Sequence, residues 1–293
     1  MLDIKDPKVA IPVVLIAGMF WSFGPYVVRH IDGAQQVPWQ YLFTRGVVIF
    51  IILNLFLYLE EGNEFIKNYT KIGISGAIGG VGLGVAMITF IYSITNTSAA
   101  VTLLCLAAMP FITALLGFLF LKETISVNVW IAISVAAFGI IIMSIDNTGK
   151  NTFTGLVFGI ASSIGFSVFS ISLRWRKETP KFTTVAIAGL FCCFFSGAMI
   201  IFNDLNFLST GKNQSLFATH GTLVCLGLIL YSIGSKNIPA AELTLLSLTE
   251  VIGGIFWVWV PILGINEIPS QGTIIGGFFI FISIIYYSLV IRS

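Results

Sequence analysis

The sequence predicts an all-α integral membrane protein with ten transmembrane helices, arranged as two inverted repeats of five helices each. Three observations lead to this fold class. Hydrophobic residues make up 57% of the 293-residue chain and charged residues only 10%, and the mean hydropathy is +0.98. Ten apolar stretches fill nearly the whole chain, and its first half partly matches its second. A water-soluble domain has no place to bury so much apolar surface.

Each apolar stretch is long enough to cross a bilayer as one helix. About 20 residues span the ~30 Å hydrocarbon core, and a helix satisfies its backbone polar groups without water. The short loops between the stretches make consecutive helices neighbours. In chain order, the expected helices are 9–29, 39–59, 71–94, 98–121, 126–145, 153–173, 183–202, 216–234, 239–263 and 269–291.

In the first half, the first stretch follows Lys5 and Lys8 as a signal sequence would, but it lacks a small-x-small cleavage site. We therefore expect a retained anchor. The second stretch ends at the turn signal Glu61-Gly62-Asn63. The third has glycines every four residues, a spacing that lets helix backbones pack closely. The fourth contains Pro110, and the fifth ends at the turn signal 146–149.

In the second half, the sixth stretch again carries closely packing glycines, Gly155 and Gly159. The seventh ends at Asn203-Asp204, and the eighth follows Gly211-Lys212-Asn213. The ninth contains Pro261, and the tenth has two more glycines spaced four apart. A proline removes a backbone hydrogen bond and can kink a helix. The candidate hinges are Pro25, Pro110 and Pro261.

Lysines and arginines are distributed unevenly between the two ends of these helices. Eleven lie on one side of the expected membrane and three on the other, and the one left over, Arg45, lies well inside a stretch. Cytoplasmic loops carry an excess of positive charge, so we expect both termini in the cytoplasm and the chain in the inner or plasma membrane. The larger group is Lys5, Lys8, Lys67, Lys71, Lys122, Arg174, Arg176, Lys177, Lys181, Lys236 and Arg292, and the smaller is Arg29, Lys150 and Lys212.

The internal match appears when the chain is shifted by 141 residues. A constant register from the first helix to the fourth favours two repeats, residues 1–147 and 148–293. Because each repeat has five helices, the second enters the membrane upside down. Inverted repeats are typical of alternating-access transporters, whose substrate site lies near the midplane. The matching residues are Gly18, Ser22, Gly24 and Val27 with Gly159, Ser163, Gly165 and Val168; Ala99-Ala100 with Ala240-Ala241; and Leu104 with Leu245.

The chain also resembles a known family over nearly its full length. The resemblance rests on YSITNTSAAVTLLCLAAMPFITALLGFLFLKE (92–123), IPAAELTLLSLTEVIGGIFWVWVPILGINEIPS (238–270), and FWSFGPYVVRH with YLFTRGVV nearer the N-terminus. These runs are similar to EamA-domain members of the drug/metabolite transporter superfamily. The resemblance implies a ten-helix secondary carrier that moves small metabolites into or out of the cell. The halves differ where Met109-Pro110 corresponds to Glu250-Val251, and where about three extra residues, including Pro261, precede Glu267.

Two charged residues lie well inside the expected helices, away from the helix ends. Glu250 falls near the midplane of the ninth helix, where an ionisable group costs ~2.5 kcal/mol or more without a partner. It is our candidate for an amine-binding and proton-coupling group, because burial disfavours the charged form of a carboxyl. Its alternative role is a structural carboxyl. Arg45 either binds a substrate carboxylate, pairs with Glu250, or extends to the helix end and bonds carbonyls there.

Aromatic and hydroxyl side chains complete the expected substrate site. Trp21 and Tyr92 are the aromatic candidates, chosen from a set of rings that otherwise face lipid or other helices. Hydroxyls on inward helix faces either contact substrate or bond neighbouring helices. Glu242, His30 and His220 are expected near helix ends without a special role. The hydroxyl candidates are Ser22, Ser163, Thr244 and Ser247, and the other rings considered are Phe23, Tyr26, Phe111, Trp257 and Trp259.

Several function classes are disfavoured by the sequence. There is no GxxxxGK[ST] loop for ATP, and the four cysteines lack the spacing of a disulfide framework or zinc site. The sparse histidines and carboxylates disfavour an enzyme, and no polar helix face favours a channel. We expect a carrier for a small zwitterion such as an amino acid or a betaine-like solute, with a cationic drug as the alternative. We expect no cofactor, metal or nucleic acid, and a monomer or homodimer in the bilayer.

Overall fold

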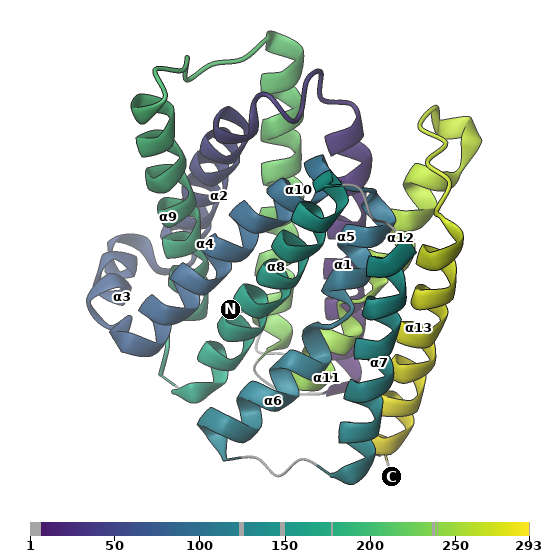
Figure 1. Ribbon diagram of the computed structural model, residues 1–293. Helices are drawn as coiled ribbons and strands as arrows, with labels where there is room; N and C mark the ends of the chain where they lie inside the picture. The colour runs from purple at the N-terminus through teal and green to yellow at the C-terminus, as the bar shows by residue number, and fades with distance from the viewer. Residues whose placement is uncertain are drawn as a thin grey trace.

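The computed structural model describes residues 7–122, 126–146, 150–176, 178–235, 238 and 240–292. Every regular element in these ranges is a helix, and the helices form one bundle (Figure 1). The α-helices are α1 (Pro7–Arg29), α2 (Pro38–Glu61), α3 (Ile66–Thr70), α4 (Gly73–Asn96), α5 (Ala99–Leu106), α6 (Met109–Leu121), α7 (Val127–Asp146), α8 (Lys150–Trp175), α9 (Lys181–Phe202), α10 (Gly211–Gly234), α11 (Ala240–Leu246), α12 (Thr249–Trp259) and α13 (Gln271–Arg292). Two short 3₁₀ helices are η1 (Gly62–Phe65) and η2 (Pro261–Leu263).

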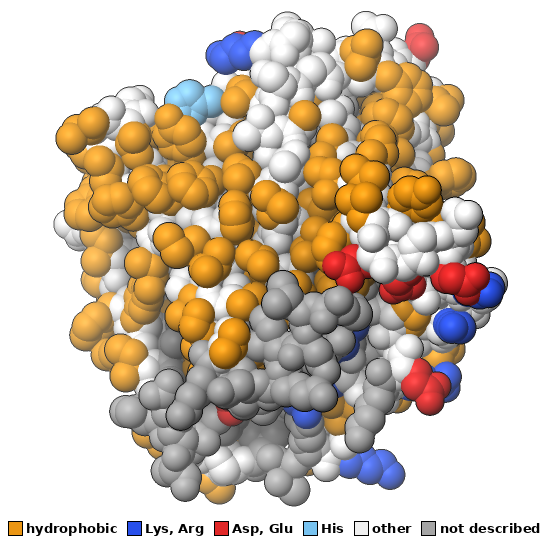
Figure 2. All heavy atoms as spheres, turned by 180° about the vertical axis from the view of Figure 1, so that it is seen from behind, with side chains coloured by type: hydrophobic (Ala, Val, Ile, Leu, Met, Phe, Trp, Pro, Cys, Tyr) orange, Lys and Arg blue, Asp and Glu red, His pale blue; other side chains and the backbone are white. Residues whose placement is uncertain are grey.

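Eight helical segments of the described chain are long and apolar enough to cross a membrane. Two more apolar helices, Trp130–Ile142 within α7 and Gln271–Ser283 within α13, are shorter over the residues considered. The protein is therefore a multi-pass membrane protein, and eight of the ten expected spans meet this test. The spans at α7 and α13 stay predictions. Figure 2 shows hydrophobic side chains across the middle of one face, with charged side chains near its upper edge and in its lower part.

The fourth expected helix is not continuous, because it divides into α5 and α6. Pro110 has no amide hydrogen, so the carbonyl of Leu106 loses the partner it would have in an unbroken helix. The chain closes a tighter turn instead, with the amide of Ala108 donating to the Cys105 carbonyl at 3.0 Å. The expectation of one helix over 98–121 is corrected at this point, and Pro110 lies beside the break.

The ninth expected helix also divides, into α11 and α12, although no proline lies at the break. Here hydroxyls bond to helix carbonyls and compete with the regular backbone pattern. Ser247 Oγ donates to the Thr244 carbonyl at 2.7 Å, and Thr249 Oγ1 donates to the Leu15 carbonyl of α1 at 3.2 Å. The segment then ends at Trp259, so Pro261 lies after α12 instead of interrupting it.

The helices of the two halves pack in corresponding pairs. In the register of the internal match, α1, α2 and α4 correspond to α8, α9 and α10. α4 packs along α8 as α1 packs along α10, α2 packs against α9, and α7 packs against α13. Both halves also have a broken helix at the corresponding place. This packing is what two similar units would give, while their inverted orientation in the membrane remains a prediction.

The upper end of the bundle in Figure 1 carries the connections 30–37, 203–210 and 264–270, and the C-terminus lies at the lower end. A cluster of polar contacts, which we call the upper clamp, joins helices at this end. Arg29 Nε lies 2.7 Å from Glu267 Oε2. The same guanidinium donates to the carbonyls of Ile94 at 2.7 Å and Thr97 at 2.9 Å. Glu267 Oε1 accepts from the amide of Ala99 at 2.5 Å.

We expect the upper clamp to contribute measurably to stability. Glu267→Gln removes a charge-assisted bond to a partly buried arginine, and such bonds contribute about 1.5–3 kcal/mol. Thermal unfolding of the purified protein in detergent should therefore move to a lower temperature. The control is Asp32→Asn, because Asp32 pairs with Lys212 at 2.7 Å where both side chains are more than half exposed. Such exposed pairs are worth about 1 kcal/mol or less. Equal shifts in both variants would contradict this assignment.

Candidate functional site

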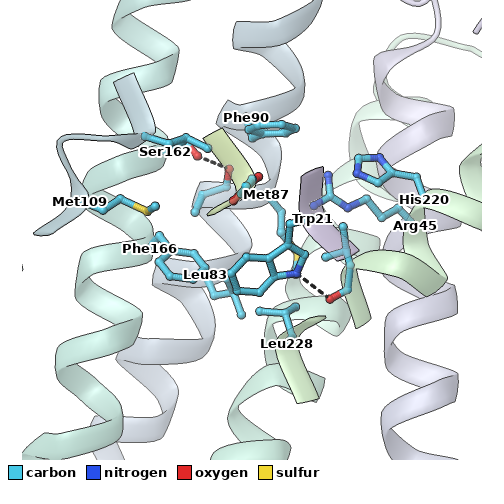
Figure 3. Close-up of a pocket in the computed structure, with 14 residues that line it drawn as sticks. Trp21, Arg45, Leu83, Met87, Phe90, Met109, Ser162, Phe166, His220 and Leu228 are labelled. Carbon is cyan, nitrogen blue, oxygen red and sulfur yellow. Dashed lines mark hydrogen bonds between the residues drawn. The ribbon is translucent and has the colours of Figure 1, made fainter. Parts of the chain in front are cut away.

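A cavity of about 60 Å³ lies where the two broken helices meet the helices around them. An ordered water needs ~10–15 Å³, so the cavity has room for a few waters or a small solute. Both halves contribute to its wall, which is aliphatic and aromatic apart from a few polar groups (Figure 3). The residues that matter most below are Trp21, Arg45, Met109, Phe166, His220 and Glu250.

Glu250 lines this cavity from the first turn of α12. Its side chain is buried, with the residue 9% exposed. The break between α11 and α12 places Glu250 in the first turn of a helix, where the amides of Glu250 and Val251 donate to the carbonyls of Ser247 and Leu248 at 3.0 Å and 2.9 Å. Met109, which corresponds to Glu250 in the first half, lines the same cavity at the start of α6. Both helix breaks therefore face the cavity, but only one supplies a carboxyl.

Arg45 reaches the cavity from α2 and is 4% exposed. Its Nε and Nη1 atoms have no hydrogen-bond partner in the described part of the chain. Among the described residues it forms no ion pair with Glu250, so the predicted pairing of these two groups is absent. It also does not extend to the helix end. A buried charge without partners is costly, and Arg45 lines the same cavity as the Glu250 carboxyl while two of its donor atoms are unused by the described chain.

His220 belongs to the same wall, contrary to the expectation of a histidine at a helix end. The sequence placed the start of its helix at residue 216, whereas α10 starts at Gly211. His220 therefore lies deeper, and it is 2% exposed. Its Nδ1 atom is hydrogen-bonded to the hydroxyl of Tyr41, which is fully buried on α2. Figure 3 shows His220 and Arg45 on the same wall of the cavity.

Trp21 lines the cavity from α1, and its predicted contact with a substrate stays a prediction. Its Nε1 donates to the Val224 carbonyl of α10 at 3.2 Å. Its ring meets Phe166 edge-on, with centroids 5.6 Å apart. The polar atom of the indole is thus used in packing, and the ring contributes apolar surface to the cavity.

The other predicted substrate contacts lie outside the cavity wall. Ser22 Oγ accepts from Trp257 Nε1 at 3.0 Å and donates to the Met19 carbonyl at 2.7 Å. Ser163 Oγ donates to the Cys105 carbonyl at 2.7 Å, which joins α8 to α5. These bonds satisfy both hydroxyls by packing alone, and a substrate contact from either stays a prediction.

The remaining candidates are similarly placed away from the cavity. Thr244 and Ser247 donate to carbonyls within their own helical turn, at 2.9 Å and 2.7 Å. Tyr92 packs against Trp39 with ring centroids 5.1 Å apart. Of the three candidate hinges, Pro25 lies inside α1, which continues through it. Their roles in binding or movement stay predictions.

Several residues that line the cavity could not be identified individually from the sequence. Leu83, Met87 and Phe90 share one face of α4, and Ser162 with Phe166 shares one face of α8. Helical spacing could have grouped them, since residues three and four apart are neighbours on a helix. However, a face of this kind is equally typical of helix packing, so spacing alone does not identify a cavity.

Gly227 of α10 makes room for Trp21, and this gives a test of the cavity wall. A Cβ atom at Gly227 would lie 2.1 Å from Trp21 Nε1. Gly227→Ala should displace the indole, disrupt its bond to Val224 and destabilise the protein by about 1–3 kcal/mol, as overpacking does. Thermal unfolding and the tryptophan emission spectrum would report both effects. Gly211→Ala is the control, because nothing lies within 4 Å of a Cβ there. An unchanged emission spectrum for Gly227→Ala would contradict this placement of Trp21.

The first half of the chain is similar to a known family, and nearly the whole chain is similar in fold to a solved structure. The model of the EamA-like transporter family matches residues 8–145, which confirms the resemblance found in the sequence. Two Helicobacter pylori proteins, from strains J99 and 26695, are each 26% identical to this chain. Each alignment covers 84% of both chains, and both proteins are described as uncharacterized transporters. A crystal structure of another protein aligns over 97% of this chain and 99% of its own, with a TM-score of 0.66 and 16% identity.

Proposed function

We propose that this chain, an EamA-like transporter by the match over residues 8–145, is a secondary carrier for small zwitterionic or amine-bearing solutes. The observation that carries this proposal is a buried acid and a buried base that line one cavity without pairing. Glu250 offers a carboxyl for an ammonium group, and Arg45 offers donors for a carboxylate. A solute that carries both groups satisfies both side chains at once, which offsets the cost of keeping them buried.

Alternating access is the mechanism that we propose for this carrier. Substrate sites of such carriers lie where discontinuous helices meet between two repeats. The breaks at α5–α6 and α11–α12 both face this cavity, and the corresponding packing of the two halves supports their relative movement.

Proton coupling through Glu250 is part of the proposal. A bulky cationic drug is the less suitable substrate, because the cavity is small and Arg45 would repel a cation.

Counterflow in liposomes tests the transport mechanism. Vesicles containing purified protein and an excess of unlabelled glycine should transiently accumulate radiolabelled glycine from outside. Accumulation requires a site that faces the two sides in turn, so a channel cannot produce it. We would repeat the assay with a panel of amino acids and betaine, and with glucose as a neutral control. Uptake that never exceeds equilibration with any solute of the zwitterion panel would refute the carrier proposal.

The orientation of the chain is a separate prediction from the distribution of lysine and arginine. We expect both termini on the cytoplasmic side, because eleven of these residues lie on that side and three on the other. Topology reporters fused after Ser293 and inserted within Asn206–Ser215 should therefore report opposite sides of the membrane. A C-terminal reporter on the external side would overturn the orientation, although it would leave the proposed site unchanged.

A further inference from the structure

His220 and Tyr41 carry an inference about how the cavity binds the acidic end of its solute. The Tyr41 hydroxyl is fully buried, and in the described part of the chain its hydrogen-bond partner is His220 Nδ1 alone. A buried hydroxyl hydrogen without an acceptor costs about 1–3 kcal/mol. The arrangement without this cost has Tyr41 donating its hydrogen to Nδ1.

This bond determines the tautomer of the histidine. A neutral imidazole has one donor nitrogen and one acceptor nitrogen, and the partner of one decides the role of the other. Because Nδ1 accepts from Tyr41, the ring hydrogen lies on Nε2. That atom faces Gly24 of α1, where a Cβ would lie only 2.8 Å away. Because Gly24 has no side chain, this edge of the ring packs close to the α1 backbone, and Nε2 has no hydrogen-bond partner among the described residues.

Arg45 adds donors to the same wall. Its Nε and Nη1 atoms lack hydrogen-bond partners among the described residues, and the residue is more than nine-tenths buried. Arginine has donors and no acceptor, and the neutral His220 also presents a donor. Both residues line the cavity, and their polar atoms without a partner among the described residues are donors, whereas Glu250 is the carboxyl that lines it.

We propose that Arg45 and His220 form a donor-only subsite for the carboxylate of the solute, and that Tyr41 is a positioning residue that keeps the His220 hydrogen on Nε2. The proposal rests on the proposed function, and it fixes the direction in which a zwitterion lies in the cavity. The carboxylate faces α2 and α10, and the ammonium faces α12. A carboxylate accepts hydrogen bonds without donating any, so it matches a wall of donors.

Nuclear magnetic resonance of the histidine rings tests the tautomer directly, because the chain has only two histidines. The purified full-length protein would be labelled with ¹⁵N in the imidazoles, and a His30→Gln variant would assign the signals. We expect His220 to show the Nε2–H tautomer alone. Its Nε2–H signal should move on addition of acetate or glycine and stay unchanged with methylamine. The Nδ1–H tautomer, or a signal that neither acetate nor glycine moves, would overturn the proposal.

Variants of Tyr41 and His220 show whether Tyr41 positions the His220 hydrogen or has only a general structural role. Tyr41→Phe should give a mixture of tautomers and weaken glycine and acetate binding by roughly 2- to 10-fold, as loss of one hydrogen bond does. Methylamine binding should be unchanged. His220→Gln keeps an amide donor near the Nε2 position and should retain more carboxylate affinity than His220→Asn. Equal weakening of glycine and methylamine in Tyr41→Phe, with an unchanged tautomer, would refute the role of Tyr41.

These results are distinguishable from the outcome of the transport assay. Acetate could move the His220 signal in a protein that fails to exchange any zwitterion in liposomes. The subsite would then stand and the proposed carrier function would fail. Glycine counterflow without any response of the His220 signal to glycine would have the opposite meaning, because the function would stand and the subsite would be refuted.

Discussion

Glu250→Gln should lower the rate of zwitterion transport by roughly 100-fold, because a buried bond between a carboxylate and an ammonium is worth about 3 kcal/mol. Glutamine keeps the shape of the side chain and removes its charge. It also removes the exchangeable proton, so any residual transport should lose its pH dependence. In the wild-type protein, lower pH protonates the carboxyl and competes with the amine, so solute affinity should fall as pH falls. Labelled-solute counterflow measured across a pH series checks both statements.

The control for this variant is Glu242→Gln. Glu242 lies in the first turn of α11, is partly exposed and lies outside the cavity wall. We expect nearly wild-type transport with the wild-type pH profile from this variant. Thermal unfolding of both variants would establish that they fold. If folded Glu250→Gln transported at the wild-type rate and pH profile, Glu250 would be structural and the coupling site would have to be abandoned.

Arg45→Met should eliminate zwitterion transport and at the same time raise the temperature of unfolding. Methionine has a similar length and fills the apolar wall, while it removes a buried charge whose donors lack partners. Replacing buried charges by apolar residues is often stabilising by about 1–4 kcal/mol. Counterflow and thermal unfolding in detergent would measure the two effects on the same preparation. We expect transport to fall while the temperature of unfolding rises, because residues that bind a ligand often lower the stability of the protein.

Arg29→Met is the matched control for Arg45→Met. Arg29 has partners in the upper clamp: Glu267 and the carbonyls of Ile94 and Thr97. Its removal should therefore lower the temperature of unfolding, because Glu267 loses its cation. If both variants were destabilised alike, Arg45 would be a structural residue, and its open donors would not indicate a ligand.

The positions of most helices could be predicted from the sequence, because the hydropathy of a segment depends only on the residues within that segment. The sequence placed single helices at 98–121 and 239–263, and the breaks in them have different causes. Pro110 was visible, but its effect falls several residues earlier, at the carbonyl that loses a partner. The second break depends on Thr249 contacting the Leu15 carbonyl of α1. A contact between residues so far apart in the chain could not be predicted from local sequence.

The candidate site could be predicted only in part, for a similar reason. Arg45 and Glu250 were identified because a charge inside a bilayer is costly wherever it points. Ser22 and Ser163 gave equally plausible signals, but neighbouring helices satisfy their hydroxyls. His220 was misplaced because the polar first turns of α10 lowered the hydropathy there and made the helix appear to start later. Whether a small polar group faces a cavity depends on packing that the sequence does not display.

Under the proposed proton coupling, the difference between Met109 and Glu250 limits the free energy available for each transport cycle. The two residues occupy corresponding places at the helix breaks, yet only one of them can release a proton. Under the proposed coupling through Glu250, this carboxyl exchanges at most one proton for each solute molecule. One pH unit is worth about 1.4 kcal/mol per proton, so in the absence of a membrane potential it sustains about a tenfold concentration ratio of solute. Glutamate in place of Met109 would be the change that makes steeper accumulation possible.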